Sequence, residues 1–167
     1  MTTTKKNRRG LIFVLVGLLL SSSCDSRGIF NQYTSLPDNV WLQNNPIHFE
    51  FQISDTISKN NLYLKIRNNS QYQYSNLFVI THLLFPNGSK IVDTLQYEMA
   101  DKNGQFLGTG ISEIKHSTFF FKEKSLFPLS GKYKLSIWQA MRKNGSINGI
   151  KELQGITDVG FRIEKVN

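Results

Sequence analysis

Hydrophobic and polar residues alternate through much of the chain beyond residue 40, and such a period of two indicates strands with one buried face. The pattern is clearest in residues 47–54, where the apolar positions are Ile47, Phe49, Phe51 and Ile53. Residues 62–67 repeat it. Two later strands are expected over residues 132–141 and 159–164, with one face formed by Tyr133, Leu135, Ile137 and Gln139 in the first and by Val159, Phe161 and Ile163 in the second.

Residues 76–85 are apolar at nearly every position, which predicts a central strand covered on both faces. The segment Pro86-Asn87-Gly88 then supplies the positive φ angles of a tight hairpin turn. The chain is expected to return as a partner strand over residues 90–97, with one face formed by Ile91, Asp93, Leu95 and Tyr97.

Residues 117–122 predict another strand, which contains the consecutive rings Phe119, Phe120 and Phe121. Because side chains alternate across a strand, at least one ring must lie on each face. A ring that no second sheet covers would offer a docking patch. The glycine-interrupted residues 105–111 are expected to form a bulge or an edge, and residues 150–153 a helical turn.

About eight short strands with turn signals between them, and no long amphipathic helix, predict an all-β fold. The expected architecture is an antiparallel two-sheet β-sandwich, immunoglobulin-like or jelly-roll-like. The segment 131–135 (GKYKL) resembles the late strand of immunoglobulin-like and carbohydrate-binding sandwiches. An up-and-down barrel around a hydrophobic ligand is the alternative, and it would enclose a dry cavity instead of packed aromatic faces.

Residues 1–23 are expected to be a signal peptide. Four basic residues precede an apolar run from Leu11 to Leu20, and that run is about half the roughly 20 residues that a membrane-spanning helix needs. The strongly apolar run favours the general export route over the twin-arginine route that Arg8-Arg9 suggests.

The chain after the signal peptide is expected to have two parts. Residues 24–39 are polar and rich in turn residues, which predicts a lipidated N-terminus and a tether about 20 Å in reach. Docking of Ile29, Phe30 and Tyr33 onto the domain would shorten this tether. Residues 40–167 are expected to form the β-sandwich domain.

Cys24 is the only cysteine and stands at the expected cleavage point. The preceding Leu20-Ser21-Ser22-Ser23 resembles the lipobox of bacterial lipoproteins, with Ser21 where the pattern usually has Leu. This resemblance implies a thioether-linked diacylglycerol on Cys24, often with a third, amide-linked chain such as palmitate, and two or more chains make the attachment effectively permanent. The alternative is an ordinary signal peptide followed by a free thiol, since no second cysteine exists for a disulfide.

Charge gives little support to a nucleic-acid partner. Removal of residues 1–23 removes four of the 20 basic residues and none of the 12 acidic ones, which lowers the formal net charge from +8 to +4. The remaining basic residues are interspersed with acidic and amide residues, so no continuous basic patch is expected. The remaining length suits one domain.

Catalytic, cofactor-binding and metal-binding residues are not predicted. The histidines His48, His82 and His116 lie far apart in sequence, and only convergence in space would make them a zinc site. The chain has no nucleophile elbow and no phosphate-binding glycine loop. Asp101 and Asn103 form an Asp-x-Asn-Gly turn that lacks the later glutamate of an EF-hand, so hairpin-turn chemistry explains them without calcium.

Two tryptophans, Trp41 and Trp138, keep a second function open. Indole rings stack on sugars in carbohydrate-binding modules, although paired tryptophans more commonly fill the core of a sandwich. A carbohydrate-binding module of the cell envelope is therefore the alternative function, with exposed tyrosines as further stacking groups. A metal-dependent hydrolase is a third class, and it requires the three histidines to meet.

Whole phrases of the chain resemble the gliding-motility lipoprotein H family. They are residues 36–53 (LPDNVWLQNNPIHFEFQI), 74–81 (YSNLFVIT), 85–99 (FPNGSKIVDTLQYEM), 100–110 (ADKNGQFLGTG) and 140–161 (AMRKNGSINGIKELQGITDVGF). The resemblance implies a lipid-anchored cell-envelope protein that is required for gliding and is associated with machinery overlapping the type 9 secretion system. It implies no catalytic residue, and only the lipid-bearing cysteine transfers, to Cys24.

The expected function is to support the gliding apparatus through protein contacts, with no enzymatic activity, no cofactor and no small-molecule substrate. No acidic cluster follows Cys24, which favours a domain that faces the periplasm. The expected partner surface lies within residues 141–157, where Asn-Gly turns and mixed charges indicate an exposed loop, and it includes Arg142, Lys143, Asn144, Lys151 and Glu152. Two Asp-Thr-apolar triplets resemble periplasmic O-glycosylation sequons, which would place sugars on Thr56 and Thr94.

Overall fold

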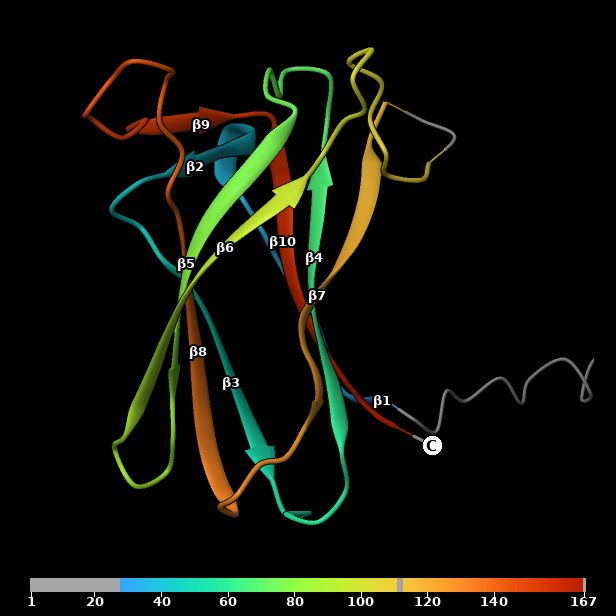
Figure 1. Cartoon of the computed structure of the whole chain (residues 1–167), viewed down its shortest axis with the longest axis vertical. Helices are drawn as coiled ribbons and strands as arrows, with labels where there is room; N and C mark the ends of the chain where they lie inside the picture. Colours follow the sequence, from blue (N-terminus) through green and yellow to red (C-terminus); the bar gives the residue numbers. More distant parts are fainter. Residues whose placement is uncertain (1–27, 111–112, 167) are drawn as a thin grey trace, which may run out of the picture.

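The computed structural model describes residues 28–110 and 113–166, which form two antiparallel four-stranded sheets packed face to face (Figure 1). Sheet A has the strand order β1-β10-β4-β7 and sheet C the order β3-β8-β5-β6, while β2 and β9 form a separate two-stranded ribbon. The elements are β1 Gly28–Ser35, the 3-10 helix η1 Pro37–Asn39, β2 Val40–Leu42, β3 Ile47–Ile53, β4 Asn60–Asn68, β5 Asn76–Leu84, β6 Lys90–Glu98, β7 Lys115–Ser125, β8 Gly131–Gln139, β9 Glu152–Gln154 and β10 Ile156–Lys165.

The predicted two-sheet β-sandwich is confirmed. Aromatic rings from both sheets fill the interior. The ring centroid of Phe51 in sheet C lies 5.4 Å from that of Phe161 in sheet A, and the Phe51 ring stacks on Tyr133 with centroids 5.6 Å apart. Phe49 lies 6.0 Å from Phe161. The two sheets therefore bury their aromatic faces against each other, as expected for a sandwich and not for a barrel around a ligand.

The strands predicted from alternation have the predicted inward faces. In β3 the four expected apolar positions are buried and the residues between them are exposed. In β8 and β10 the seven residues expected to share a face are all buried, including the polar Gln139. The expected face of β6 is also the less exposed one from Asp93 onward.

The N-terminal boundary of the domain is corrected. Residues 28–35, which the sequence pattern places in the tether, form β1 and pair with β10 along seven register positions, from Gly28 opposite Glu164 to Ser35 opposite Asp158. Phe30 packs against Phe51 at 5.5 Å, so the segment closes one edge of the core. This segment is therefore docked onto the domain, and the domain begins at Gly28 instead of Val40. Residues 1–27, including Cys24, lie outside the described residues.

Strand β5 differs from its prediction. It lies between β8 and β6, yet only its inward face is covered by the opposite sheet, and its burial alternates between buried and half-buried positions. The apolar side chains on its outer face, Phe78, Ile80 and Leu84, are partly exposed. Apolar character on both faces therefore marks an uncovered surface and not a doubly covered strand.

One other local prediction is wrong. Residues 150–153, expected to form a helical turn, lead into β9, which pairs with β2 so that Trp41 lies opposite Leu153. Residues 105–110, expected to form a bulge or an edge, form the isolated bridges Ala100–Phe106 and Thr109–His116, the second of them to the edge strand β7. The short ribbon of β2 and β9 depends on contacts between segments more than 100 positions apart, which no local pattern contains.

The two ends of the sandwich are named here for later use. The entry end holds the first residue of β1, Gly28, the last of β10, the first of β4 and the last of β7, together with loops 54–59, 85–89 and 126–130. The far end holds the β2-β9 ribbon, residues 140–151 and the loop after β6 (Figure 1). Within the described residues, no helix has the length and apolar character needed to cross a membrane.

Candidate functional site

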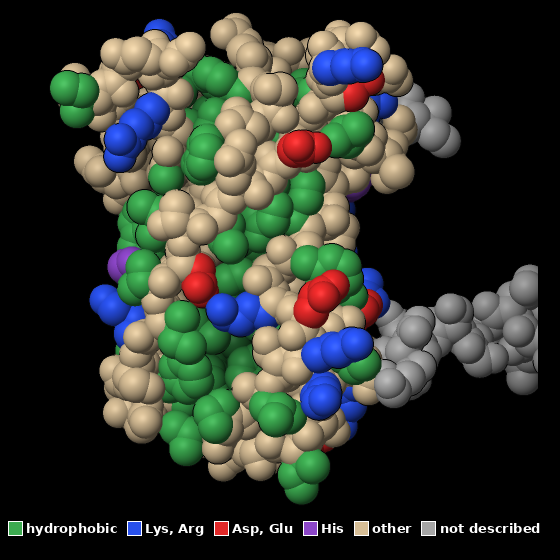
Figure 2. Space-filling model, viewed as in Figure 1, with side chains coloured by type: hydrophobic (Ala, Val, Ile, Leu, Met, Phe, Trp, Pro, Cys, Tyr) green, Lys and Arg blue, Asp and Glu red, His purple; other side chains and the backbone are tan. Residues whose placement is uncertain are grey.

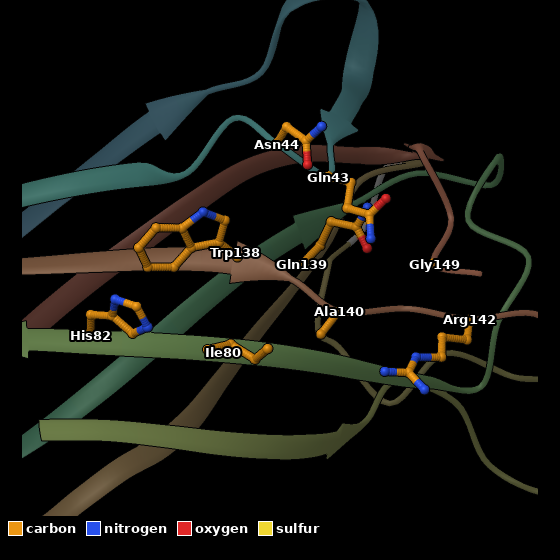
Figure 3. A pocket seen from close by; sticks show the side chains of 9 residues that line it. All are labelled: Gln43, Asn44, Ile80, His82, Trp138, Gln139, Ala140, Arg142 and Gly149. Atoms are coloured by element: carbon orange, nitrogen blue, oxygen red, sulfur yellow. The ribbon is translucent and has the colours of Figure 1, made fainter. Parts of the chain in front are cut away.

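The outer face of sheet C carries an open hollow of about 340 Å³ near the far end (Figure 3). It will be called the Trp138 hollow. Its lining comes from β5, from β8, and from two loops that are distant in sequence: Gln43, Asn44, Ile80, His82, Trp138, Gln139, Ala140, Arg142 and Gly149.

The floor of the Trp138 hollow follows from the register of β5 with β8. Ile80 lies opposite Trp138, and His82 lies opposite Ser136 on the same outward face. The His82 ring contacts the indole of Trp138 with centroids 4.4 Å apart and a tilt of 51°. Both rings are half-buried, so the floor is apolar and aromatic but open to solvent.

The rim is a small hairpin formed by residues 140–151. The side chain of Gln139 fixes it: Nε2 donates to the carbonyl of Ile150 at 2.5 Å, and Oε1 accepts the N–H of Met141 at 2.9 Å. The Ile150 N–H donates in turn to the Met141 carbonyl at 2.8 Å. Because the donor and the acceptor of this buried amide are both hydrogen-bonded to the hairpin backbone, Gln139 holds both ends of the hairpin against the end of β8.

Gly149 brings the Gln43 side chain into the hollow. A Cβ at position 149 would lie 2.1 Å from Gln43 Nε2, so only glycine leaves room for the amide in its present place. The backbone N–H of Gln43 donates to the Lys151 carbonyl at 2.8 Å and fixes this loop to the hairpin. The rim therefore presents an amide and, on the other side, the guanidinium of Arg142 (Figure 3).

The structure brings together part of the predicted partner surface. Arg142 lines the Trp138 hollow, and Lys143 and Asn144 follow it on the exposed hairpin. Lys151 is exposed where the hairpin ends. Glu152 lies apart from the others, since it lines a separate shallow hollow beside Leu42 and Asn45.

Sequence reasoning missed Gln43, Ile80 and His82 as members of this site. The available signal for Ile80 and His82 is the apolar outer face of residues 76–85, which by sequence alone predicts burial. Gln43 has no sequence signal, because its position depends on the loop–hairpin contact at Gly149.

The three histidines do not meet. His48 and His82 lie on the outer face of sheet C on either side of Ser136, and the Nδ1 atom of His48 is 2.9 Å from Ser136 Oγ. His116 lies on sheet A, where its Nδ1 accepts a hydrogen bond from Arg67 Nε at 3.0 Å. Among the described residues no group of histidines, cysteines and carboxylates is placed to hold a metal. The zinc-hydrolase interpretation is therefore wrong for these three residues.

The pKa of His48, which lies beside Ser136 on the outer face of sheet C, is lowered from its ordinary value. Partial desolvation of the ring is the main cause, and the nearby Lys134 lowers the pKa further. The imidazole therefore favours its neutral form, which suits the contact with Ser136. An aromatic floor with an amide and a cationic rim is suited to binding a ligand.

The two tryptophans do not form a joint platform. Trp41 is fully buried in the core, and its Nε1 atom finds no hydrogen-bond partner within the described part of the chain. Trp138 alone faces the hollow. A sugar-stacking role is therefore excluded for Trp41 by burial, and it is restricted to Trp138.

The consecutive phenylalanines lie on both faces of β7, as predicted. Phe121 is buried and Phe119 stacks on Tyr97 at 4.5 Å, whereas Phe120 is 50% exposed and contacts Tyr63 at 4.8 Å. Phe120 and Tyr63 thus form a small aromatic patch on the outer face of sheet A.

The remaining predicted positions lie in turns and on an edge strand. Asp101 Oδ1 accepts the N–H groups of Asn103 and Gln105, each at 2.9 Å, which is hairpin-turn chemistry. Thr56 lies half-buried in the loop before β4, and Thr94 is exposed on β6.

The fold and the Trp138 hollow define a two-sheet β-sandwich with an open aromatic hollow on one outer face. A family model described as GldH lipoprotein matches residues 28–163. The gliding motility lipoprotein GldH homolog of Christiangramia forsetii is 48% identical over 92% of this chain and 93% of its own, and the gliding motility lipoprotein GldH of Flavobacterium johnsoniae is 40% identical over 91% and 94%. The chain therefore belongs to the GldH lipoprotein family.

This membership makes the protein a gliding motility lipoprotein of the cell envelope, from a family that is not a known family of enzymes. Among solved structures, the VP2 subviral particle of infectious bursal disease virus matches 89% of this chain and 36% of its own at 15% identity, with a TM-score of 0.37. A score this low adds nothing to the description.

Proposed function

We propose that acyl chains on Cys24 hold this protein on a membrane of the cell envelope, with the sandwich facing the periplasm. From there it supports assembly or stability of the gliding machinery by contacting other envelope proteins. The connection to type 9 secretion follows from the family resemblance. The periplasmic orientation is supported by the absence of an acidic cluster directly after Cys24 in the sequence.

The proposed protein contacts rest on the exposed apolar outer face of sheet C. Apolar side chains there lie open to solvent, among them Val92, which is 51% exposed, and Phe78 and Ile80, which are partly exposed. Contiguous apolar surface of this kind marks interaction sites in proteins.

The rim of the Trp138 hollow supplies the polar part of such an interface. Arg142 borders the aromatic floor, and Lys143 extends the positive charge along the hairpin. Interfaces commonly combine an apolar centre with a charged rim that selects the partner. A partner would therefore insert an apolar side chain beside Trp138 and place carboxylates near Arg142 and Lys143.

The test is charge reversal in the full-length lipoprotein. We expect Arg142→Glu combined with Lys143→Glu to lower crosslinking to envelope partners in cells by roughly tenfold or more and to impair gliding, because opposed like charges cost several kcal/mol. Lys102→Glu, in an exposed turn at the same end, is the control and should retain both. Unchanged crosslinks and unchanged gliding in the double variant would remove this surface from the proposal.

The membrane attachment has its own test. Mass spectrometry of the mature N-terminus is expected to find an acylated Cys24, and the protein is expected to stay with membranes after a high-salt wash. Recovery of an unacylated chain with a free thiol in the soluble fraction would contradict the anchor.

A saccharide of the envelope is the second candidate ligand, and the Trp138 hollow favours it. The half-buried indole offers a face for a sugar ring, and Gln43 and Asn44 supply amides beside it. Affinity electrophoresis on a panel of polysaccharides separates the two functions. Retardation that Trp138→Ala abolishes would support the saccharide, and no retardation on any of them would leave the protein partner as the proposal.

A further inference from the structure

The entry end exposes large apolar side chains at loop tips. Ile57, in the loop between β3 and β4, is 87% exposed, and Leu126, just after β7, is 52% exposed. Three more apolar side chains at this end are between 37% and 41% exposed, namely Ile29, Leu84 and Ile91. In Figure 2 hydrophobic side chains extend to the lower tip of the molecule.

An ordered loop presents Ile57. The Asp55 carboxylate accepts the N–H groups of Ile57 and Ser58 through Oδ1 at 3.0 and 2.9 Å, and its Oδ2 accepts the Ser58 hydroxyl and Lys165 Nζ, each at 2.7 Å. The backbone is therefore fixed while the Ile57 side chain points into solvent. An ordered loop that exposes an apolar side chain in this way is suited to contact with another molecule or a membrane.

Leu126 is held outside in a comparable way. Its neighbour Phe127 is buried, with its ring 5.0 Å from Tyr133 and 5.8 Å from Phe51. The Tyr133 hydroxyl donates to the carbonyl of Leu129 at 2.8 Å. This loop is thus fastened to the core directly after its apolar tip.

Lysines surround these tips. Lys59, Lys90 and Lys124 are exposed, and no carboxylate of the described residues lies within ion-pair range of them. Two more, Lys132 and Lys165, are paired with Glu50 and Asp55 at 2.6 and 2.7 Å. Unpaired lysines next to exposed apolar side chains are the combination that binds an anionic lipid surface.

The length of chain before β1 brings this end to the membrane. Four residue steps separate Cys24 from Gly28, and such a segment spans at most about 14 Å. Neighbouring strands lie about 4.8 Å apart, so the start of β4 and the end of β7 lie within about 15 Å of Gly28 across the sheet. An acylated Cys24 therefore keeps the entry end close to the lipid surface.

We propose that the entry end lies on the membrane surface, with Ile57 and Leu126 inserted at the headgroup level and Lys59, Lys90 and Lys124 against anionic headgroups. This inference rests on the proposed acylation of Cys24. It also orients the molecule: Trp138 lies seven residues along β8 from Gly131, which places the Trp138 hollow on the order of 20 Å from the lipid. The membrane contact and the partner contact then lie at opposite ends of one rigid domain.

The test uses full-length, acylated protein reconstituted into vesicles of phosphatidylcholine and phosphatidylglycerol. Ile57→Cys is labelled with an NBD fluorophore, since acylation leaves Cys24 without a thiol that could react. Ile147→Cys is the matched control, because Ile147 is 92% exposed on the far-end hairpin. We expect blue-shifted emission and several-fold weaker quenching by iodide at position 57 than at position 147.

The outcomes separate this inference from the proposed anchor. Protein that does not float with the vesicles contradicts the acylation of Cys24. Protein that floats while both labels are equally quenched overturns the lipid contact alone. Shielding of position 57 in native envelopes but not in pure lipid vesicles would also overturn it, in favour of a protein partner at this end.

A charge variant provides the second measurement. Lys59→Glu with Lys124→Glu, added to the labelled Ile57→Cys protein, is expected to restore iodide quenching at position 57 while the protein still floats. Vesicles of phosphatidylcholine alone should likewise restore iodide quenching at position 57 in the labelled protein that keeps Lys59 and Lys124. Shielding that neither change alters would overturn the role of the lysines.

Discussion

Replacement of Phe30 by alanine tests whether residues 28–35 belong to the fold. As part of a tether, Phe30 would contribute nothing to stability. In the structure its ring lies 5.5 Å from Phe51, 5.8 Å from Phe161 and 6.3 Å from Phe49, so it touches aromatic residues of both sheets. A fully buried phenylalanine costs about 3–5 kcal/mol on truncation. Phe30 is half-buried, and we therefore expect a loss of about 2–3 kcal/mol in the free energy of unfolding.

Urea unfolding of the full-length protein, followed by fluorescence, measures this loss. The fully buried Trp41 should report the exposure of the core directly. A loss of 2–3 kcal/mol corresponds to a decrease in Tm of roughly 6–12 °C for a domain of this size. Ile29→Ala is the control, since Ile29 is the adjacent apolar residue on the same strand and is 37% exposed; its cost should stay below about 1 kcal/mol. Equal, small effects of both changes would refute the inclusion of β1 in the core.

Two further predictions concern backbone fit and protonation. Gly155→Ala should destabilise the fold by more than about 2 kcal/mol, because the residue has φ +85° and a Cβ there would lie 2.1 Å from the Tyr72 nitrogen; Gly88→Ala, at φ +83° with open space around it, should cost only about 1 kcal/mol in the same urea titration. His48 should make the fold sensitive to acid. Burial first and a nearby lysine second lower its pKa, so the folded state favours the neutral ring and stability falls as the pH drops below about 6.5. His48→Gln should flatten that part of the stability curve, and an unchanged slope would contradict the role of His48.

The arrangement proposed for the molecule separates two kinds of contact. The short link from Cys24 and the lysine-rich entry end are proposed to lie at the lipid, whereas the Trp138 hollow and its hairpin lie at the far end. Variants at one end should therefore leave the function of the other end intact, because changes at distant sites without shared contacts usually act independently. Loss of partner crosslinks in the Lys59→Glu and Lys124→Glu variant would argue that orientation on the membrane is needed for partner binding.

The sequence by itself determined the sheet class, most strands and their inward faces. Strands such as β3 and β4 show their buried face in strict alternation, because side chains of a strand point to opposite sides and one side must be apolar. The hairpin turns at Asn87-Gly88 and Asn103-Gly104 were equally local, since positive φ at Gly88 and Gly104 is a property of the turn itself. The family resemblance came from whole phrases and not from alternation.

Only the tertiary structure decided where non-local partners lie. Strand β1 has a weak pattern of its own and becomes part of the fold through its register with β10, and the β2-β9 ribbon joins segments from the two halves of the chain. The outer face of β5 has the same composition as a buried face, so its exposure depends on which sheet faces which. The Trp138 hollow likewise joins Gln43, whose amide lies against Gly149, to a strand about 90 residues further along the chain. Alternation along one strand reflects the burial of that strand, whereas a surface built from several segments is fixed by their packing.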